Sequence, residues 1–319
     1  MLGEEAPAMH TKREKHPLEN EPRVVEKTNI VKTFVLFTLF SYLCVELLRK
    51  TMEKTKVLYV SQEIMPYLAE SEVSRVGRYL PENIQNKGKE IRTFVPRWGN
   101  INERRNQLHE VIRLSGMNLI IDDNDHQLII KVASIPSARI QIYFIDNEDF
   151  FSRKAVMTDA DGEEFADNDE RAIFFARGVL ETVKKLNWSP TVVHCIGWMS
   201  AIVPIYLKKV FADDPLFRDV KIVVSLADDR FERPLDQDLS KKIENEGIKD
   251  EKLAILAEPS YENFYRYVID YADGVVVASD KADPKLVEYA RSTGKHMLEW
   301  QNVEDAELFD NYNRFYDEL

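Results

Sequence analysis

The strongest constraint on the fold is a strand–turn–helix unit between residues 57 and 88. A continuous apolar strand, Val57–Val60, leads into a turn, and a helix predicted over Glu72–Asn86 ends before Gly88. In αβ domains with this unit the turn commonly binds an anion, and its glycines let bare backbone N–H groups approach the ligand. Residues 68–73 contain no glycine and no lysine, and they carry two carboxylates. The unit therefore predicts an αβ scaffold in which the turn between this strand and helix repels anions.

Strands and helices alternate along the rest of the chain. Several strand candidates are continuous β-branched runs, which are typical of strands covered on both faces. The predicted strands are Val57–Val60, Glu90–Val95, Leu128–Val132, Ile140–Ile145, Thr191–Cys195, Lys221–Leu226 and Gly274–Ala278. The predicted helices are Glu72–Asn86, Asp169–Leu186, Trp198–Phe211, Ser260–Tyr271, Pro284–Ser292 and Val303–Tyr316. This alternation predicts the α/β class, with a Rossmann-like, doubly wound and mainly parallel sheet.

Three segments depart from simple alternation. Closely spaced strands between residues 90 and 145, with a turn at residues 122–125, predict an inserted hairpin. Residues 229–258 are highly charged with weak periodicity, and they predict a loop or lid with a short helix. The last helix is amphipathic, and we expect its aromatic side chains to pack against the domain: Phe309, Tyr312, Phe315 and Tyr316.

The chain is acidic and poor in cysteine. Its formal net charge is −12, and an acidic domain repels nucleic acid and anionic membranes. After residue 51 the only cysteine is Cys195, so this part has no internal disulfide, which fits a reducing compartment. No Cys/His cluster has the spacing of a metal site. We therefore expect a cytoplasmic protein with no metal, no cofactor and no nucleic-acid partner.

Residues 1–51 are predicted to be an extension outside the fold. Residues 3–27 are polar and charged without an apolar period, which is typical of disorder. An uncharged run of 13 residues, Thr33–Val45, follows. Widened to residues 30–48, the run approaches the length of a membrane-spanning helix. One interpretation is therefore a signal-anchor. We expect the protein to associate with a membrane only if residues 30–48 act as that anchor. The alternative is that Met52 is the true start. In either case residues 52–319 are predicted to form a single domain.

Six motifs, read in order, resemble the N-terminal half of bacterial glycogen synthases and plant starch synthases. The first keeps Glu63, Pro66 and Leu80-Pro81 in the family's frame. The other five are Val95–Ile101, Ile142–Asp146, Phe165–Arg177, Val192–Trp198 and Tyr271–Ser279. The resemblance implies half of a GT-B fold, in which two Rossmann-like domains face each other across a cleft. It also implies the family's reaction, in which glucose passes from ADP-glucose to the non-reducing end of an α-1,4-glucan.

The chain departs from the family at the loop that closes on the donor phosphates. The family has Lys-x-Gly-Gly there, and this chain has Ala69, Glu70, Ser71 and Glu72. A charge-assisted hydrogen bond contributes roughly 1.5–3 kcal/mol. Replacing the lysine and adding two carboxylates turns attraction for a diphosphate into repulsion.

Two further departures fall in the strand-to-helix corners of the same half. In the family's His-Asp-Trp-His motif, Gly197 and Met199 replace the aspartate and the second histidine, while Trp198 remains. Ala227 stands where a later family strand ends in a histidine. Losing one preorganised polar group at a transition state typically costs about 10²–10³ in rate, so these losses predict little transfer.

The chain is also short for two such domains. Only 40 residues follow Ser279, fewer than the family's donor-binding domain needs. We expect no catalytic residue and a domain that is not self-sufficient for glucosyl transfer, with an accessory role that binds α-glucan or a glycogen-metabolism protein. One alternative is a split glucosyltransferase that uses ADP-glucose with a donor domain on another chain. The other is a purely structural Rossmann-like protein.

Four residues remain candidates for a sugar-binding cleft. Trp198 could stack on a sugar ring or pack the strand-to-helix corner. Asp228 and Asp229 follow a strand end, where they could bind a cation or sugar hydroxyls or begin a solvated loop. Glu63 could line the cleft or cap the following helix. The neighbouring His194 we expect to be a packed, hydrogen-bonded core residue.

Overall fold

The computed structural model describes residues 54–319 together with Val35, Leu36 and Phe40. Contacts divide the chain into two units, Met1–Glu53 and Lys54–Leu319, and only the second is described below. Most of the predicted extension lies outside the described residues, so the signal-anchor and the start at Met52 stay predictions. Among the described residues, no helix is long and apolar enough to cross a membrane.

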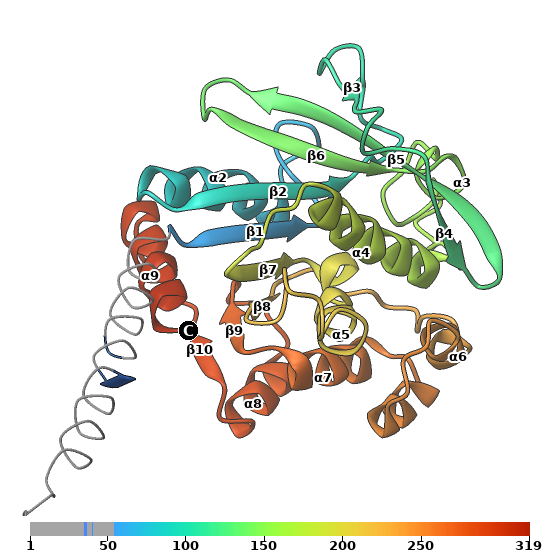
Figure 1. The fold of residues 1–319 in the computed structure, drawn as a ribbon. Coiled ribbons are helices and arrows are strands. Elements are labelled where there is room, and N and C mark those ends of the chain that lie inside the picture. The colour runs from blue at the N-terminus through green and yellow to red at the C-terminus, as the bar shows by residue number, and fades with distance from the viewer. Residues whose placement is uncertain (1–34, 37–39, 41–53) are drawn as a thin grey trace, which may run out of the picture. The chain divides into compact units, whose positions relative to one another are not determined.

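A single large sheet organises residues 54–319 (Figure 1). Its strands are β1 (Lys56–Ser61), β2 (Glu90–Pro96), β3 (His109–Glu110), β4 (Met117–Ile121), β5 (Asn124–Ile135), β6 (Ile140–Asp146), β7 (Val192–Ile196), β8 (Lys221–Leu226), β9 (Gly274–Val277) and β10 (His296–Leu298). The strand order is β10-β9-β8-β7-β1-β2-β6-β5-β3, and β4 pairs with β5. The strands from β10 to β6 are parallel, while β5 runs antiparallel to β6. The prediction of a mainly parallel sheet is confirmed.

Helices cover both faces of this sheet. They are α2 (Glu72–Asn86), α3 (Glu148–Phe151), α4 (Asn168–Lys185), α5 (Val203–Lys209), α6 (Leu239–Asn245), α7 (Tyr261–Tyr271), α8 (Pro284–Ser292) and α9 (Asp305–Glu318), with short 3-10 helices η1 (Trp198–Ser200) and η2 (Glu251–Ala257). Alternation along β1 separates two hydrophobic cores, because successive side chains point to opposite faces. Leu58 and Val60 join the core under α4, α5 and α7. Val57 and Tyr59 join the core under α2 and α9.

The C-terminal helix closes the second core. The four aromatic side chains of α9 are buried there, at 2–8% exposure, as the amphipathic pattern predicted: Phe309, Tyr312, Phe315 and Tyr316. In Figure 1, α9 lies beside α2 at one end of the sheet. These aromatics therefore stabilise the fold rather than face a ligand.

Two local predictions have different outcomes. The hairpin is confirmed, because β4 and β5 pair across a two-residue turn at Asp122 and Asp123, which have φ of 44° and 64°. The continuous helix over Trp198–Phe211 is wrong. The segment forms η1, breaks, and resumes as α5 with a proline in its first turn. Proline is favoured there because that position needs no backbone N–H.

The segment after β8 forms the predicted loop with a short helix. Its helix α6 is followed by η2 before the chain enters α7. Lys242 on α6 is 5% exposed and its Nζ lies 2.8 Å from Asp169, 2.7 Å from Glu170 and 3.0 Å from Asp236. These ion pairs fix α6 to the first turn of α4.

Candidate functional site

A cleft opens where β1, β7 and β8 end at the carboxyl edge of the parallel sheet. This is the edge at which open αβ sheets bind ligands. The cleft has a volume of about 380 Å³, within the range of small-molecule sites. Its lining combines charged and aromatic side chains: Gln62, Glu63, Ser71, Glu72, Val73, Met157, Thr158, Glu164, Trp198, Asp228, Asp229, Arg230, Phe231 and Lys281. We call it the sheet-edge cleft.

The turn before α2 forms one wall of the cleft and is held by its own side chains. The Ser71 hydroxyl accepts from the Ser74 backbone N–H at 3.0 Å, and the Ser74 hydroxyl accepts from the Ser71 N–H at 2.8 Å. This reciprocal capping box satisfies the helix start without glycine. Ser71 also donates to the Glu63 carboxylate at 2.6 Å. Glu63 therefore lines the cleft and supports the cap at the same time.

The remaining altered loop positions lie around this wall. Ser71 and Glu72 line the cleft, whereas Ala69 and Glu70 are exposed and do not. The Glu70 carboxylate lies 3.9 Å from Arg75. Because Glu72 occupies the first turn of α2, its charge stands at the helix end where an anionic ligand would bind.

The corner after β7 forms the opposite wall. Trp198 is 1% exposed and makes edge contacts with Phe231 and Phe264. It packs the corner, and its ring has no open face for a sugar. Gly197 has φ of 87°, and a Cβ there would lie 2.7 Å from the Cβ of Gln62, so this position requires glycine.

The altered corner residues are buried below the cleft surface. Met199 is fully buried, and its N–H donates to Gln62 Oε1 at 3.1 Å. Ala227 is 6% exposed beyond the end of β8. The altered turn, through Ser71 and Glu72, lines the same cleft as Trp198, the unchanged residue between Gly197 and Met199.

Asp228 and Asp229 do not act as a pair. Asp228 is exposed and its carboxylate lies 3.2 Å from Lys281 Nζ. Asp229 turns inward and accepts hydrogen bonds from the Trp198 N–H at 2.5 Å and from the Tyr261 hydroxyl at 2.9 Å. Asp228 therefore faces solvent, whereas Asp229 is tied to the protein, and the binding of a cation or of sugar hydroxyls by either residue stays a prediction.

The charge of Asp229 is held without a cationic partner among the described residues. Burial raises the pKa of Asp229 to about 6, hydrogen bonds from Tyr261, Trp198 and Tyr265 oppose that rise, and the negative charge of Glu63 adds to it. Burial and the Asp229 charge raise the pKa of Tyr261 far above its ordinary value. The tyrosine hydroxyl therefore stays protonated and donates to the carboxylate.

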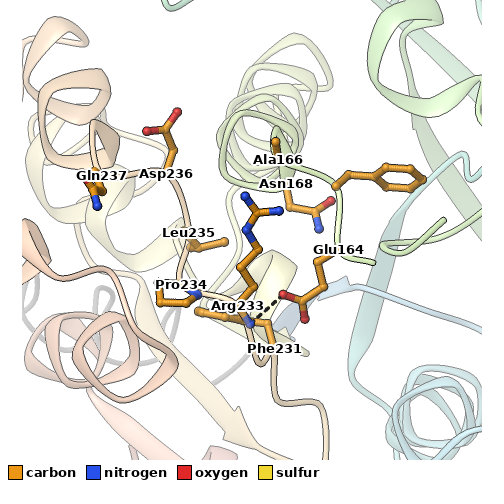
Figure 2. A pocket seen from close by; sticks show the side chains of 10 residues that line it. Glu164, Ala166, Asn168, Phe231, Arg233, Pro234, Leu235, Asp236 and Gln237 are labelled. Carbon is orange, nitrogen blue, oxygen red and sulfur yellow. Dashed lines mark hydrogen bonds between the residues drawn. The ribbon is translucent and has the colours of Figure 1, made fainter. Parts of the chain in front are cut away.

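A second cavity adjoins the sheet-edge cleft and shares Glu164 and Phe231 with it. It has a volume of about 480 Å³. Figure 2 shows its lining: Glu164, Phe165, Ala166, Asn168, Phe231, Arg233, Pro234, Leu235, Asp236 and Gln237. The Glu164 carboxylate accepts from the backbone N–H groups of Glu232 and Arg233 at 3.0 and 2.9 Å. It thereby joins the segment before α4 to the segment after β8.

Several cleft residues were missed by sequence reasoning. Gln62 lies between Ser61 and Glu63 at the end of β1, and its place at a strand's carboxyl end was an available signal. Glu164, Arg230 and Lys281 lie in irregular segments. No periodicity in these segments indicates which side chains turn toward the sheet edge.

His194 is separate from the cleft. It is fully buried, with Nδ1 2.7 Å from the Tyr316 hydroxyl and Nε2 2.8 Å from the Ser225 hydroxyl. Burial lowers its pKa to about 3, so the ring is neutral. The expectation of a packed, hydrogen-bonded histidine is confirmed. Within residues 54–319 and the three placed residues before them, no group of three or more His, Cys, Asp or Glu side chains is arranged to hold a metal ion.

Comparisons with known proteins agree with this architecture. Residues 56–298 match the model of the starch synthase catalytic domain. The glycogen synthase of Chlorobium limicola is 39% identical over 172 residues, covering 54% of this chain and 35% of that protein. The glycogen synthase of Chlorobaculum tepidum is 32% identical over 243 residues, covering 73% of this chain and 47% of that protein. The chain thus spans less than half the length of these relatives.

A solved structure has a similar fold. It is the catalytic domain of starch synthase IV from Arabidopsis thaliana bound to ADP and acarbose, with a TM-score of 0.61 and 16% identity. The similarity covers 80% of this chain and 53% of that one. At this identity the similarity concerns the fold, a Rossmann-like half of a glycosyltransferase catalytic domain.

Proposed function

Because this chain belongs to the family of starch synthase catalytic domains, we propose that it is a glycogen/starch synthase-like domain that does not transfer glucose by itself. Its role is accessory: it binds α-glucan, or a protein of glycogen metabolism, through the carboxyl edge of its sheet. The proposal concerns the chemistry of the cleft, where the ligand-binding groups of the family have been replaced.

One observation carries the proposal. The N-terminus of α2 is capped by Ser71 and Ser74, and the Glu63 carboxylate is hydrogen-bonded to the same cap. A diphosphate binds at a helix N-terminus through exposed N–H groups and positive charge. Here Glu72 adds negative charge to the first turn, so that a diphosphate would meet repulsion.

The corner after β7 supports the same proposal. Gly197 and Met199 have no polar side chain to place near a reacting sugar, and Ala227 lies where the family resemblance expects a histidine. The polar groups that remain, Glu63 and Asp229, accept hydrogen bonds from the protein. A cleft whose remaining carboxylates are acceptors, and whose altered corner positions carry no polar side chain, favours binding over group transfer, because such positions stabilise no developing negative charge.

The test is an assay of glucose incorporation from ADP-[¹⁴C]glucose into glycogen by the full chain, with the Chlorobium limicola glycogen synthase as positive control. We expect incorporation at background and no measurable binding of ADP-glucose by calorimetry. Glycogen co-sedimentation is expected to bring down the chain but not a control protein of similar charge. Turnover by the chain alone would reject the proposal, and failure to bind any of several glucans would leave only the protein-partner role.

Turnover that appears only with a separately supplied donor domain would indicate the split transferase instead. The cytoplasmic location expected from the sequence stays a prediction, which cell fractionation with an antibody against residues 54–319 would test.

A further inference from the structure

The sheet-edge cleft has more negative than positive charge. Five carboxylates line it, from Glu63, Glu72, Glu164, Asp228 and Asp229, against two cations. The cations, Arg230 and Lys281, are already engaged: Lys281 lies 3.2 Å from Asp228, and Arg230 lies 3.1 Å from Asp283. No cation reaches Glu63 or Asp229 among the residues that the structure describes, and the charge of Glu63 is close enough to raise the pKa of Asp229.

A buried amide supplies an independent sign of a ligand. Gln62 is 2% exposed and lines the cleft. Its Oε1 accepts from the Met199 N–H, but its Nε2 has no hydrogen-bond partner within the described part of the chain. Nε2 is not among the polar side-chain atoms that are both without a hydrogen-bond partner and fully shielded from solvent. The amide donor therefore retains access to the cleft, where an acceptor on a ligand would satisfy it.

These two features restrict the chemistry of the occupant. The unpaired carboxylates favour a cation, and the arrangement of acidic side chains is not that of a metal site in the described residues. A lysine or arginine side chain carries hydrogen-bond donors only, so that side chain alone leaves the Gln62 amide unsatisfied. A small ligand that satisfies both features carries a protonated amine beside an acceptor oxygen, as an amino sugar does through its hydroxyls.

We propose that the sheet-edge cleft binds an amino sugar, with the protonated amine at Glu63 and Asp229 and a hydroxyl oxygen at the Gln62 amide. This ligand class goes beyond the α-glucan of the proposed function, because glucose units carry no charge. The cleft volume of about 380 Å³ accommodates a small sugar. The negative charge that repels a diphosphate is the feature that attracts the amine.

The test is isothermal titration calorimetry on the full chain with three disaccharides: chitobiose with both amines free, its di-N-acetylated form, and maltose. We expect the free-amine sugar to bind about tenfold more tightly than either neutral sugar, since a hydrogen bond to a charged group is stronger than a neutral one. Its affinity should fall as salt is added. Equal affinity for the three sugars, or no heat with the free-amine sugar at millimolar concentration, would overturn the inference.

Single substitutions distinguish the contribution of the cleft's charge to affinity from that of its shape. Glu63→Gln keeps an acceptor for Ser71 and removes the charge, and we expect about tenfold weaker binding of the free-amine sugar. Glu288→Gln removes the same charge from the exposed face of α8 and should leave the affinity unchanged. Gln62→Met should weaken binding by a few-fold, with circular dichroism confirming that it folds. An unchanged affinity in Glu63→Gln, or an equal loss in both glutamate variants, would overturn the inference.

The outcomes separate this inference from the proposed function. Co-sedimentation with glycogen without preference for the amine would overturn the inference and retain the accessory glucan-binding role. Glucosyl transfer from ADP-glucose would overturn the proposed function, and the calorimetry would still decide whether the cleft prefers an amine.

Discussion

His194 and Asp229 both accept or share hydrogen bonds with tyrosine hydroxyls, yet their surroundings differ, because His194 is fully buried and Asp229 is partly exposed. His194 lies within β7, and both ring nitrogens are hydrogen-bonded to buried hydroxyls. Asp229 lies three residues beyond β8 and lines the sheet-edge cleft. In a parallel sheet, position along the strand thus decides the role of a polar residue. Inside the strand it holds the core together, and past the carboxyl end it can meet a ligand.

The two groups also differ in charge. Burial lowers the pKa of His194 to about 3, and burial raises the pKa of Asp229 to about 6. At neutral pH the histidine is uncharged and the aspartate is ionised. Only the second group carries a charge that a ligand can use, although both are held by tyrosine hydroxyls.

The largest expected effect is on stability at His194. Replacing it in His194→Ala leaves a cavity in the core and removes the partners of Ser225 and Tyr316, so we expect a loss of about 3 kcal/mol in the free energy of unfolding. Asp229→Ala should lose about half as much, because water from the cleft can reach the tyrosine hydroxyls. Urea unfolding followed by circular dichroism measures both.

Tyr316→Phe serves as the matched control for His194, because it removes one hydroxyl and keeps the ring. We expect a loss of about 1 kcal/mol. A greater loss in Asp229→Ala than in His194→Ala would contradict the division into a core group and a cleft group.

The pH dependence of stability should separate the two groups by sign. Asp229 holds its proton more tightly when folded, so its contribution is full below about pH 4 and is lost as the pH rises through about 6. His194 holds its proton less tightly when folded, so its contribution is full above about pH 6.5 and is lost as the pH falls towards 3. Each group changes stability by at most about 1.4 kcal/mol per pH unit.

Asp229→Asn tests this assignment. We expect the difference in unfolding free energy, wild type minus variant, to fall as the pH rises from 4 to 6. Chemical denaturation at half-unit steps measures the difference, in which the contributions of other groups cancel. Parallel curves for the two proteins would mean that Asp229 titrates with the same pKa in the folded and unfolded states.

Local signals made much of the fold predictable. The helix Glu72–Asn86 was predicted at its bounds because a glycine just after the last turn, here Gly88, is a local signal that ends a helix. The break after Ser200 was not predicted, because the apolar pattern of residues 198–211 continues across it. Strand β10 was missed because three residues carry too little periodicity.

The site was predictable only in part, because long-range contacts set its side-chain directions. Glu63 could be placed at the cleft from its position after β1. The inward turn of Asp229 depends on Tyr261 of α7, which is 32 residues away in sequence. Adjacent aspartates look alike in a sequence, whereas Asp228 reaches Lys281 at the surface and Asp229 reaches the tyrosine.

The smallest expected effect on the free energy of unfolding is at the cap of α2. Its Ser71 is a half-buried polar residue and can be compared with His194 in the core. Ser71→Ala removes the acceptor for the Ser74 N–H and the donor to Glu63, and we expect a loss of about 1 kcal/mol. The cost stays below that of His194→Ala because solvent in the cleft can replace both bonds. Hydrogen exchange should quicken at residues 72–75 and stay unchanged in β7. Faster exchange in β7 would mean that the helix cap and the core around His194 unfold as one unit. The residues at the cleft would then not open independently of the core, which would contradict the distinction between a core group and a cleft group.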